Sequence, residues 1–132
     1  MGAWGVGPFD NDAALDFAGG LADIPADTAD GLAEAMSFVV ETDDYIEGPE
    51  MDAALAAACF VAARMDPTVP ITGSGRKYLD ELEFTVDENL RALAAQVFVR
   101  ALEPADNEWY SLWSDSLPQV EAALAPYRAV IG

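Results

Sequence analysis

The sequence predicts an all-α fold, a single compact bundle of about five to seven helices formed by residues 1–132. Apolar residues recur at intervals of three and four in several segments, which is the period of an amphipathic helix. Capping residues and prolines stand where these segments begin. Strand signals are weak throughout, and hydrophobic residues make up 52% of the chain, which is enough for the core of one domain.

The chain opens with a segment that does not favour a helix. Residues 4–9, WGVGPF, are rich in Gly and Pro, so we expect an extended stretch that lays its two aromatic side chains on the core. A helix is predicted over about 12–23, because Asp10, Asn11 or Asp12 can cap its first turn.

Two further helices are predicted before the middle of the chain. Pro25 leads into a helix over about 26–41, and Pro49 suits the first turn of a helix over about 50–65. Residues 53–63 of the latter, AALAAACFVAA, have almost no polar face. A helix that is apolar all round is surrounded by others, so we expect this one at the centre of the bundle.

The second half of the chain begins with a break. Residues 66–75 contain two prolines and two glycines, and they predict a loop followed by a short helix over 76–83. Thr85 and Glu88 have the spacing of a capping box at the start of a strong helix over about 87–103.

Two helices are predicted near the end of the chain. Asn107 begins a short helix, and Ser116 marks the start of a final one. Pro126 is expected to end or kink that last helix, because proline lacks the backbone N–H of a helix interior.

The charge of the chain is strongly negative and unevenly distributed. The net charge is −18, from 24 acidic and six basic residues, and the first basic residue is Arg64. The residues before it carry thirteen carboxylates, so −13 of the net charge lies in the first half and −5 in the second. Such a field repels nucleic acid and anionic lipid and attracts cationic surfaces.

Several classes of function receive no support from the composition. The chain has no His, which removes the commonest metal ligand and the commonest general base together. No metal or cofactor is therefore expected. The longest apolar run has eleven residues, too short to span a bilayer, and no signal peptide is visible. We expect a cytoplasmic protein that binds neither nucleic acid nor membrane, and the sequence leaves its oligomeric state open.

Three segments carry a resemblance to a known family. They read WGVGPFDND-x-A at the start, DDYIEGPEMDAALAAACFVAA in the middle, and NEWYSLW followed by VEAALAPYRA near the end. In this order they resemble the bacterial proteins grouped as domain of unknown function 4259. The resemblance implies a small intracellular bacterial domain and brings no catalytic residues with it.

Two groups of carboxylates are candidates for a binding face. Asp10, Asp12 and Asp16 form the densest local set, and a second set follows in Asp43, Asp44, Glu47 and Glu50. Oxygen ligands of this kind suit Ca²⁺ or Mg²⁺, but the first set departs from the EF-hand pattern, and helix capping explains it as well. The second set, beside Tyr45, suits a Lys or Arg of a basic partner and is also typical of a solvated loop.

Aromatic residues near the end of the chain offer a second kind of contact. Trp109 and Trp113 are candidates for an exposed anchor, because such residues dominate binding hot spots. They share a helical face, and core packing is the alternative.

Two other features favour structural roles. The segment Gly73–Lys77 lacks the spacing and the preceding strand of a phosphate-binding loop, so we expect a flexible loop. Cys59 lies within the apolar run without any His to activate it, which indicates a buried core residue.

Two classes of function remain in competition. The first is a non-enzymatic protein-binding module, immunity- or inhibitor-like, that docks its acidic half on a basic partner. The second is a carboxylate- or divalent-cation-dependent enzyme, for which the sequence selects no catalytic pair. The acidity also has an environmental explanation, adaptation to a salty cytoplasm, in which no partner is implied.

Overall fold

The computed structural model describes residues 3–71 and 73–132. The prediction of an all-α bundle is confirmed: seven α-helices and two 3₁₀ turns make up the described part, with isolated β-bridges in place of strands. The elements are α1 (Asp12–Asp23), a 3₁₀ turn (Pro25–Asp27), α2 (Thr28–Glu41), α3 (Gly48–Met65), α4 (Gly73–Glu81), α5 (Glu88–Ala101), α6 (Glu108–Trp113), a second 3₁₀ turn (Ser114–Ser116) and α7 (Leu117–Ile131).

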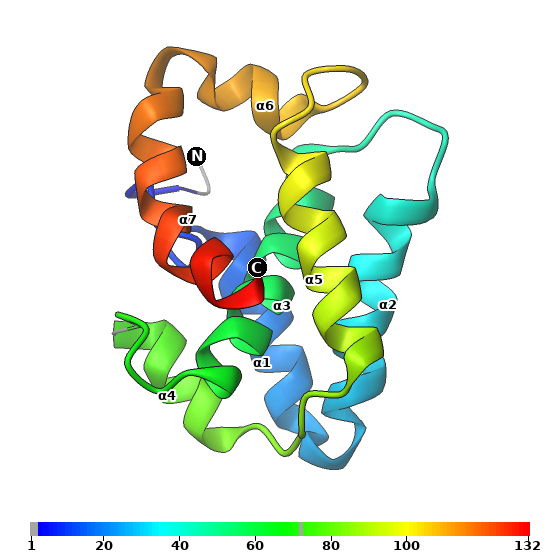
Figure 1. Cartoon of the computed structure of the whole chain (residues 1–132), viewed down its shortest axis with the longest axis vertical. Helices are drawn as coiled ribbons and strands as arrows, with labels where there is room; N and C mark the ends of the chain where they lie inside the picture. The colour runs from blue at the N-terminus through cyan, green and yellow to red at the C-terminus, as the bar shows by residue number, and fades with distance from the viewer. Residues whose placement is uncertain (1–2, 72) are drawn as a thin grey trace.

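Helix α3 is the centre of the bundle, as its apolar sequence predicts. It packs against α1, α2, α5 and α7 and also touches α4 and α6, so the other helices surround it (Figure 1). Every residue from Ala54 to Ala63 is buried. The many Ala side chains on this helix let its neighbours approach closely on all sides.

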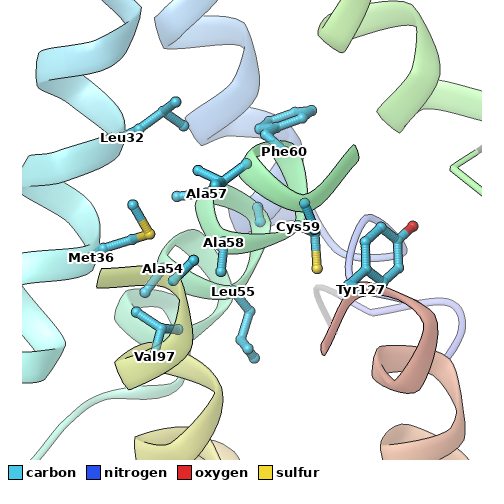
Figure 2. Close-up of a cluster of buried hydrophobic side chains, with 14 of the residues drawn as sticks. Leu32, Met36, Ala54, Leu55, Ala57, Ala58, Cys59, Phe60, Val97 and Tyr127 are labelled. Carbon is cyan, nitrogen blue, oxygen red and sulfur yellow. The ribbon is translucent and has the colours of Figure 1, made fainter. Parts of the chain in front are cut away.

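Larger side chains from the surrounding helices fill the space around α3. Figure 2 shows Leu32 and Met36 of α2 and Val97 of α5 on one side of the central helix, and Tyr127 of α7 on another. All four belong to a single cluster of buried residues that extends from Phe9 to Ile131. The core therefore joins both ends of the chain.

Most helices begin where the sequence predicts, with one difference in the capping residue. Asn11 caps α1, because its side chain accepts a hydrogen bond from the N–H of Ala14 at 2.8 Å. The capping box predicted from Thr85 does not form: Asp87 caps α5 instead and accepts from the N–H of Leu90 at 2.8 Å.

The flexible loop expected over Gly73–Lys77 is wrong, because the whole segment lies in α4. Gly75 is buried, and a Cβ built on it would lie 2.7 Å from the ring of Phe9. Glycine is needed here because the opening segment crosses α4 at this point. Thr72 lies outside the described residues.

Two further expectations are corrected in part. Of the two alternatives for Pro126, that it ends the last helix is wrong, because α7 continues to Ile131. Tyr127 and Ile131 are both buried, and their packing holds the turn that follows the proline. The opening segment lays Phe9 on the core, but Trp4 is 60% exposed.

Asn107 fixes the connection between α5 and α6 from a fully enclosed position. Its side-chain amide donates to the carbonyls of Arg100, Ala101 and Glu103 at 3.0 to 3.3 Å. Its side-chain oxygen accepts from the N–H of Tyr110, which caps α6. One side chain thus ends one helix and begins the next.

Candidate functional site

The acidic residues predicted at the start of α1 have different environments. Asp12 and Asp16 are exposed on the helix. Asp10 turns back on the opening segment, where its carboxylate accepts a hydrogen bond from the N–H of Gly7 at 3.1 Å. The capping interpretation of this group is correct in outline, with Asn11 as the cap.

The acidic loop before α3 divides into exposed and engaged carboxylates. Asp43, Asp44 and Glu47 are exposed, whereas Glu50 is partly buried and accepts from the N–H of Glu47 at 2.9 Å. Glu50 therefore supports the start of α3. Figure 1 shows most of this loop on the side of the molecule where α2 and α5 lie, away from the beginning of α1.

The structure instead joins the loop to the connection between α5 and α6. The N–H of Ile46 donates to the carbonyl of Asp106 at 2.8 Å, and the N–H of Glu108 donates to the carbonyl of Ile46 at 3.0 Å. The carboxylate of Glu108 then accepts from the N–H of Gly48 at 2.6 Å, at the positive end of α3. These contacts hold two acidic segments side by side.

Tyr45 stands in the middle of this arrangement and is 53% exposed. Its pKa is raised by loss of water around the hydroxyl and by the negative charges of Glu108, Glu47 and Asp106. We call Asp43, Asp44, Tyr45, Glu47, Asp106 and Glu108 the acidic corner.

The carboxylates of the acidic corner are not neutralised by basic side chains. In residues 3–71 and 73–132 the ion pairs are Arg76–Asp80 and Arg91–Glu88, both within single helices of the second half. Arg100 lies near the corner, but its guanidinium donates to backbone carbonyls, including that of Ala105 at 2.7 Å. The carboxylates of the corner therefore form no ion pair within the described residues, although the positive charge of Arg100 lies beside the backbone of Asp106.

The two tryptophans predicted as an anchor differ in exposure. Trp109 is 4% exposed and belongs to the core, as the alternative of core packing predicts. Trp113 is partly buried at the edge of a small cavity. The prediction of an exposed anchor is therefore wrong for Trp109.

That cavity is the second region of interest, and four parts of the chain enclose it. The opening segment contributes Val6 and Pro8, α3 contributes Asp52, and α6 contributes Trp109 and Trp113. Leu55 of α3 and two residues of α7, Val120 and Leu124, complete an apolar wall. The cavity volume is about 10 Å³, room for one group of the size of a water molecule.

Asp52 is the charged group of this cavity. Burial raises the pKa of its carboxyl to about 6, and the indole N–H of Trp109 lowers it in part by hydrogen bonding. A carboxylate titrating this close to neutrality is unusual and is typical of functional positions. Asp52 is not among the residues that the sequence predicts as a site; the one available signal is an acid directly before the apolar run of α3.

The remaining sequence candidates fall outside both regions. Cys59 is buried, and its side chain points toward the α7 side of the core, where Tyr127 lies (Figure 2). Burial raises the pKa of the thiol, which leaves it protonated. The described residues contain no group of three acidic or thiol side chains that could hold a metal ion.

No helix in the described part of the chain has the length and apolar character needed to cross a membrane.

The three segments that carry the family resemblance meet at the Asp52 cavity. Val6 and Pro8 come from the opening segment, Asp52 and Leu55 from the middle one, and Trp109 and Trp113 from the late one. The model of a protein family described as "Domain of unknown function (DUF4259)" matches residues 2–124. Comparisons with curated proteins and with solved structures find no match.

Proposed function

The chain belongs to the DUF4259 family, and on this premise we propose that it is a non-enzymatic protein-binding module of the cytoplasm, immunity- or inhibitor-like, that docks on a basic partner. The acidic corner is the docking surface. The observation that supports it is the exposed Tyr45, held among Glu47, Asp106 and Glu108 by backbone hydrogen bonds between two segments.

The acidic corner has the composition of a surface that receives Lys or Arg. An exposed aromatic ring offers a face for a cation, and the surrounding carboxylates offer charge-assisted hydrogen bonds. Because the pairing of Ile46 with Asn107 fixes the loop, little ordering entropy is lost on binding. The charge of the whole chain adds a long-range attraction that raises the association rate.

A pull-down from native lysate tests the proposal. The chain is the bait at low and at high salt, beside a variant in which Asp43→Asn, Asp44→Asn and Glu47→Gln are combined. The matched control carries Asp12→Asn, Asp16→Asn and Asp23→Asn, which remove the same formal charge from exposed positions on α1. A basic protein recovered at low salt by wild type and control, and lost by the loop variant, supports the acidic corner.

Two results would contradict the proposal. Recovery of no basic protein at low salt removes the docking role. Equal loss of a partner from both variants shows that net charge, rather than the acidic corner, determines binding.

The alternative of a carboxylate-dependent enzyme draws on the raised pKa of Asp52. The volume of its cavity, about 10 Å³, favours a very small ligand over a substrate of metabolite size. A calorimetric titration with Mg²⁺, Mn²⁺ and Ca²⁺ tests the divalent-cation form of this alternative. Saturable binding that Asp52→Asn abolishes would favour it over the binding module.

A further inference from the structure

Helix α2 carries an exposed aromatic side chain on the face turned away from the core. Phe38 is 51% exposed, although Met36 and Val39 on the same helix are fully buried. The hollow beside the Phe38 ring is lined by residues of α2 and by Thr42, which follows it. The other helices of the described chain therefore leave this side of the ring uncovered.

Two carboxylates stand on either side of this ring. Glu34 precedes Phe38 by four positions and Glu41 follows it by three, so all three side chains share one face of α2. Both acids are exposed, and neither takes part in the ion pairs found in residues 3–71 and 73–132. We call Glu34, Phe38 and Glu41 the α2 knob, an apolar ring between two negative charges.

A groove with the opposite character lies on another face of the molecule. Helix α5 is placed between α2 and α7, and the groove runs between α5 and α7 (Figure 1). Its volume is about 400 Å³, which is enough for an aromatic ring. Val99 at its edge is 62% exposed. The lining is mainly apolar and consists of Ala95, Phe98, Val99, Ala125, Arg128, Ala129, Ile131 and Gly132. We call this feature the α5–α7 groove.

The α5–α7 groove is preformed and carries positive side-chain charge. The guanidinium of Arg91 donates to the carbonyl of Ile131 at 3.0 Å, which fixes the end of α7 against α5. Arg128 is exposed and belongs to neither ion pair of the described residues. Arg100 and Glu103 line an adjoining groove that shares Val99. The side chains of the two grooves thus carry two positive charges and one negative, in a chain whose net charge is −18.

We propose that the α2 knob of one copy of this chain docks in the α5–α7 groove of a second copy. The Phe38 ring packs beside Val99, and a carboxylate of the knob pairs with Arg128. The argument for a second copy is the match of charge and shape: the knob is apolar and negative, and the groove is apolar and positive. This inference does not depend on the proposed basic partner.

The contact is head-to-tail, because the knob and the groove are different surfaces of the chain. Each pair of copies keeps one free knob and one free groove, so further copies can add. The contact is also small: an aromatic side chain buries about 150–250 Å², whereas a stable interface buries about 1,600 Å². We therefore expect weak association, with a Kd of about 0.1–1 mM.

Mixing two variants tests the geometry. Phe38→Ser removes the knob and keeps the groove, whereas Val99→Asp spoils the groove and keeps the knob; both positions are exposed, so both variants should fold. Sedimentation velocity is measured up to about 1 mM chain in 0.15 M NaCl, where a Debye length of about 8 Å limits repulsion between the acidic chains. We expect wild type to self-associate, each variant alone to do so at least about tenfold more weakly, and an equimolar mixture to form a heterodimer.

NMR locates the contact in the same mixture. The ¹H–¹⁵N spectrum of labelled Phe38→Ser is titrated with unlabelled Val99→Asp, and saturable shifts are expected for the amides of Val99, Ala125 and Ala129. The matched control is a titration with unlabelled Phe38→Ser, which supplies no knob and should leave these signals in place. Leu112→Ser, a change at an apolar residue that is 70% exposed on α6, should self-associate within about twofold of wild type.

Neutralisation of the knob tests the charge match. Glu34→Gln combined with Glu41→Gln should weaken self-association by about two- to fivefold, because the pairing with Arg128 is lost. Asp12→Asn combined with Asp16→Asn removes the same formal charge from α1, and this control should associate as tightly as wild type or more tightly, since the chains repel less.

Three results would overturn the proposal. Wild type that sediments as a monomer at about 1 mM removes the self-association. Variants that each lose it but do not recover it when mixed exclude the head-to-tail contact. A Leu112→Ser variant that loses as much affinity as Phe38→Ser shows a non-specific apolar contact. The acidic corner is unchanged in all of these variants, so its pull-down is judged separately.

Discussion

Replacement of Asp52 by Asn should stabilise the chain at neutral pH. The pKa of the wild-type carboxyl is about 6 in the folded chain, against 3.8 for an ordinary exposed Asp, a difference of about two units. Each unit corresponds to about 1.4 kcal/mol, so ionisation of Asp52 costs the folded state about 3 kcal/mol. The amide of Asn has the same shape and no charge, so it avoids this cost. Burial of the polar amide is itself unfavourable by about 1 kcal/mol. We expect a net gain of about 1–3 kcal/mol in the free energy of unfolding at pH 7.

The pH dependence of this gain follows from the direction of the pKa shift. Below pH 3.8 the group is protonated in both states and no cost arises. Between pH 3.8 and about 6 the unfolded chain releases the proton while the folded chain retains it, so wild-type stability falls as pH rises. Above this range the cost is constant. The difference between variant and wild type should therefore grow across this window and then level off.

Urea unfolding followed by tryptophan fluorescence, at pH values from about 3.5 to 7.5, measures this difference. Asp16→Asn is the matched control, because it removes one exposed charge from α1 and separates the effect of burial from that of net repulsion. A variant less stable than wild type at pH 7, or a gain that does not change with pH, would show that Asp52 is well solvated or paired in the folded state.

Three further experiments test the packing and the hydrogen bonds of the fold. Asn107→Ala should lower the free energy of unfolding by about 2–4 kcal/mol, because it leaves three carbonyls and the start of α6 without partners; urea unfolding checks it, and a loss under about 1 kcal/mol would mean that water replaces the amide. Gly75→Ala should destabilise the chain by about 1–3 kcal/mol, because the new Cβ would meet the Phe9 ring. Gly20→Ala is the control: a Cβ there has no neighbour within 4 Å, so the substitution should stabilise α1 by about 0.5–1 kcal/mol. Thermal melts in which both variants shift in the same direction would contradict the contact between Phe9 and Gly75. Arg64→Ala should lower the free energy of unfolding by about 2–3 kcal/mol, because the guanidinium donates to the carbonyls of Phe84, Leu79 and Leu82 and lies 4.2 Å from the Phe84 ring centroid. Arg64→Lys should recover less than half of that loss in urea unfolding.

Local features of the sequence were sufficient to predict the helices. Periodic apolar residues and capping residues act within a few positions of each other, and they placed α1 and α2 closely and identified α3 as the central helix. The errors arose where a distant segment decides the local structure. Gly73–Gly75 reads as a loop until Phe9, more than sixty positions earlier, packs on Gly75 and favours a helical turn with no side chain at that position.

The candidate sites also depend on contacts between distant segments, which the sequence does not show. The sequence identified Asp43, Asp44 and Glu47 as an acidic loop, but gave no sign that Asp106 and Glu108 lie beside it. Trp109 and Trp113 stood out as aromatic residues, yet only their position against Asp52 shows what they enclose.

The sequence by itself determined that this chain is acidic and helical and that its central helix is apolar on every side. Tertiary structure alone decided which carboxylates are in water, which cap a helix and which one is enclosed. The reason is physical: the free energy of a charge depends on the solvent and the groups around it, and in this chain those groups come from segments sixty or more residues apart.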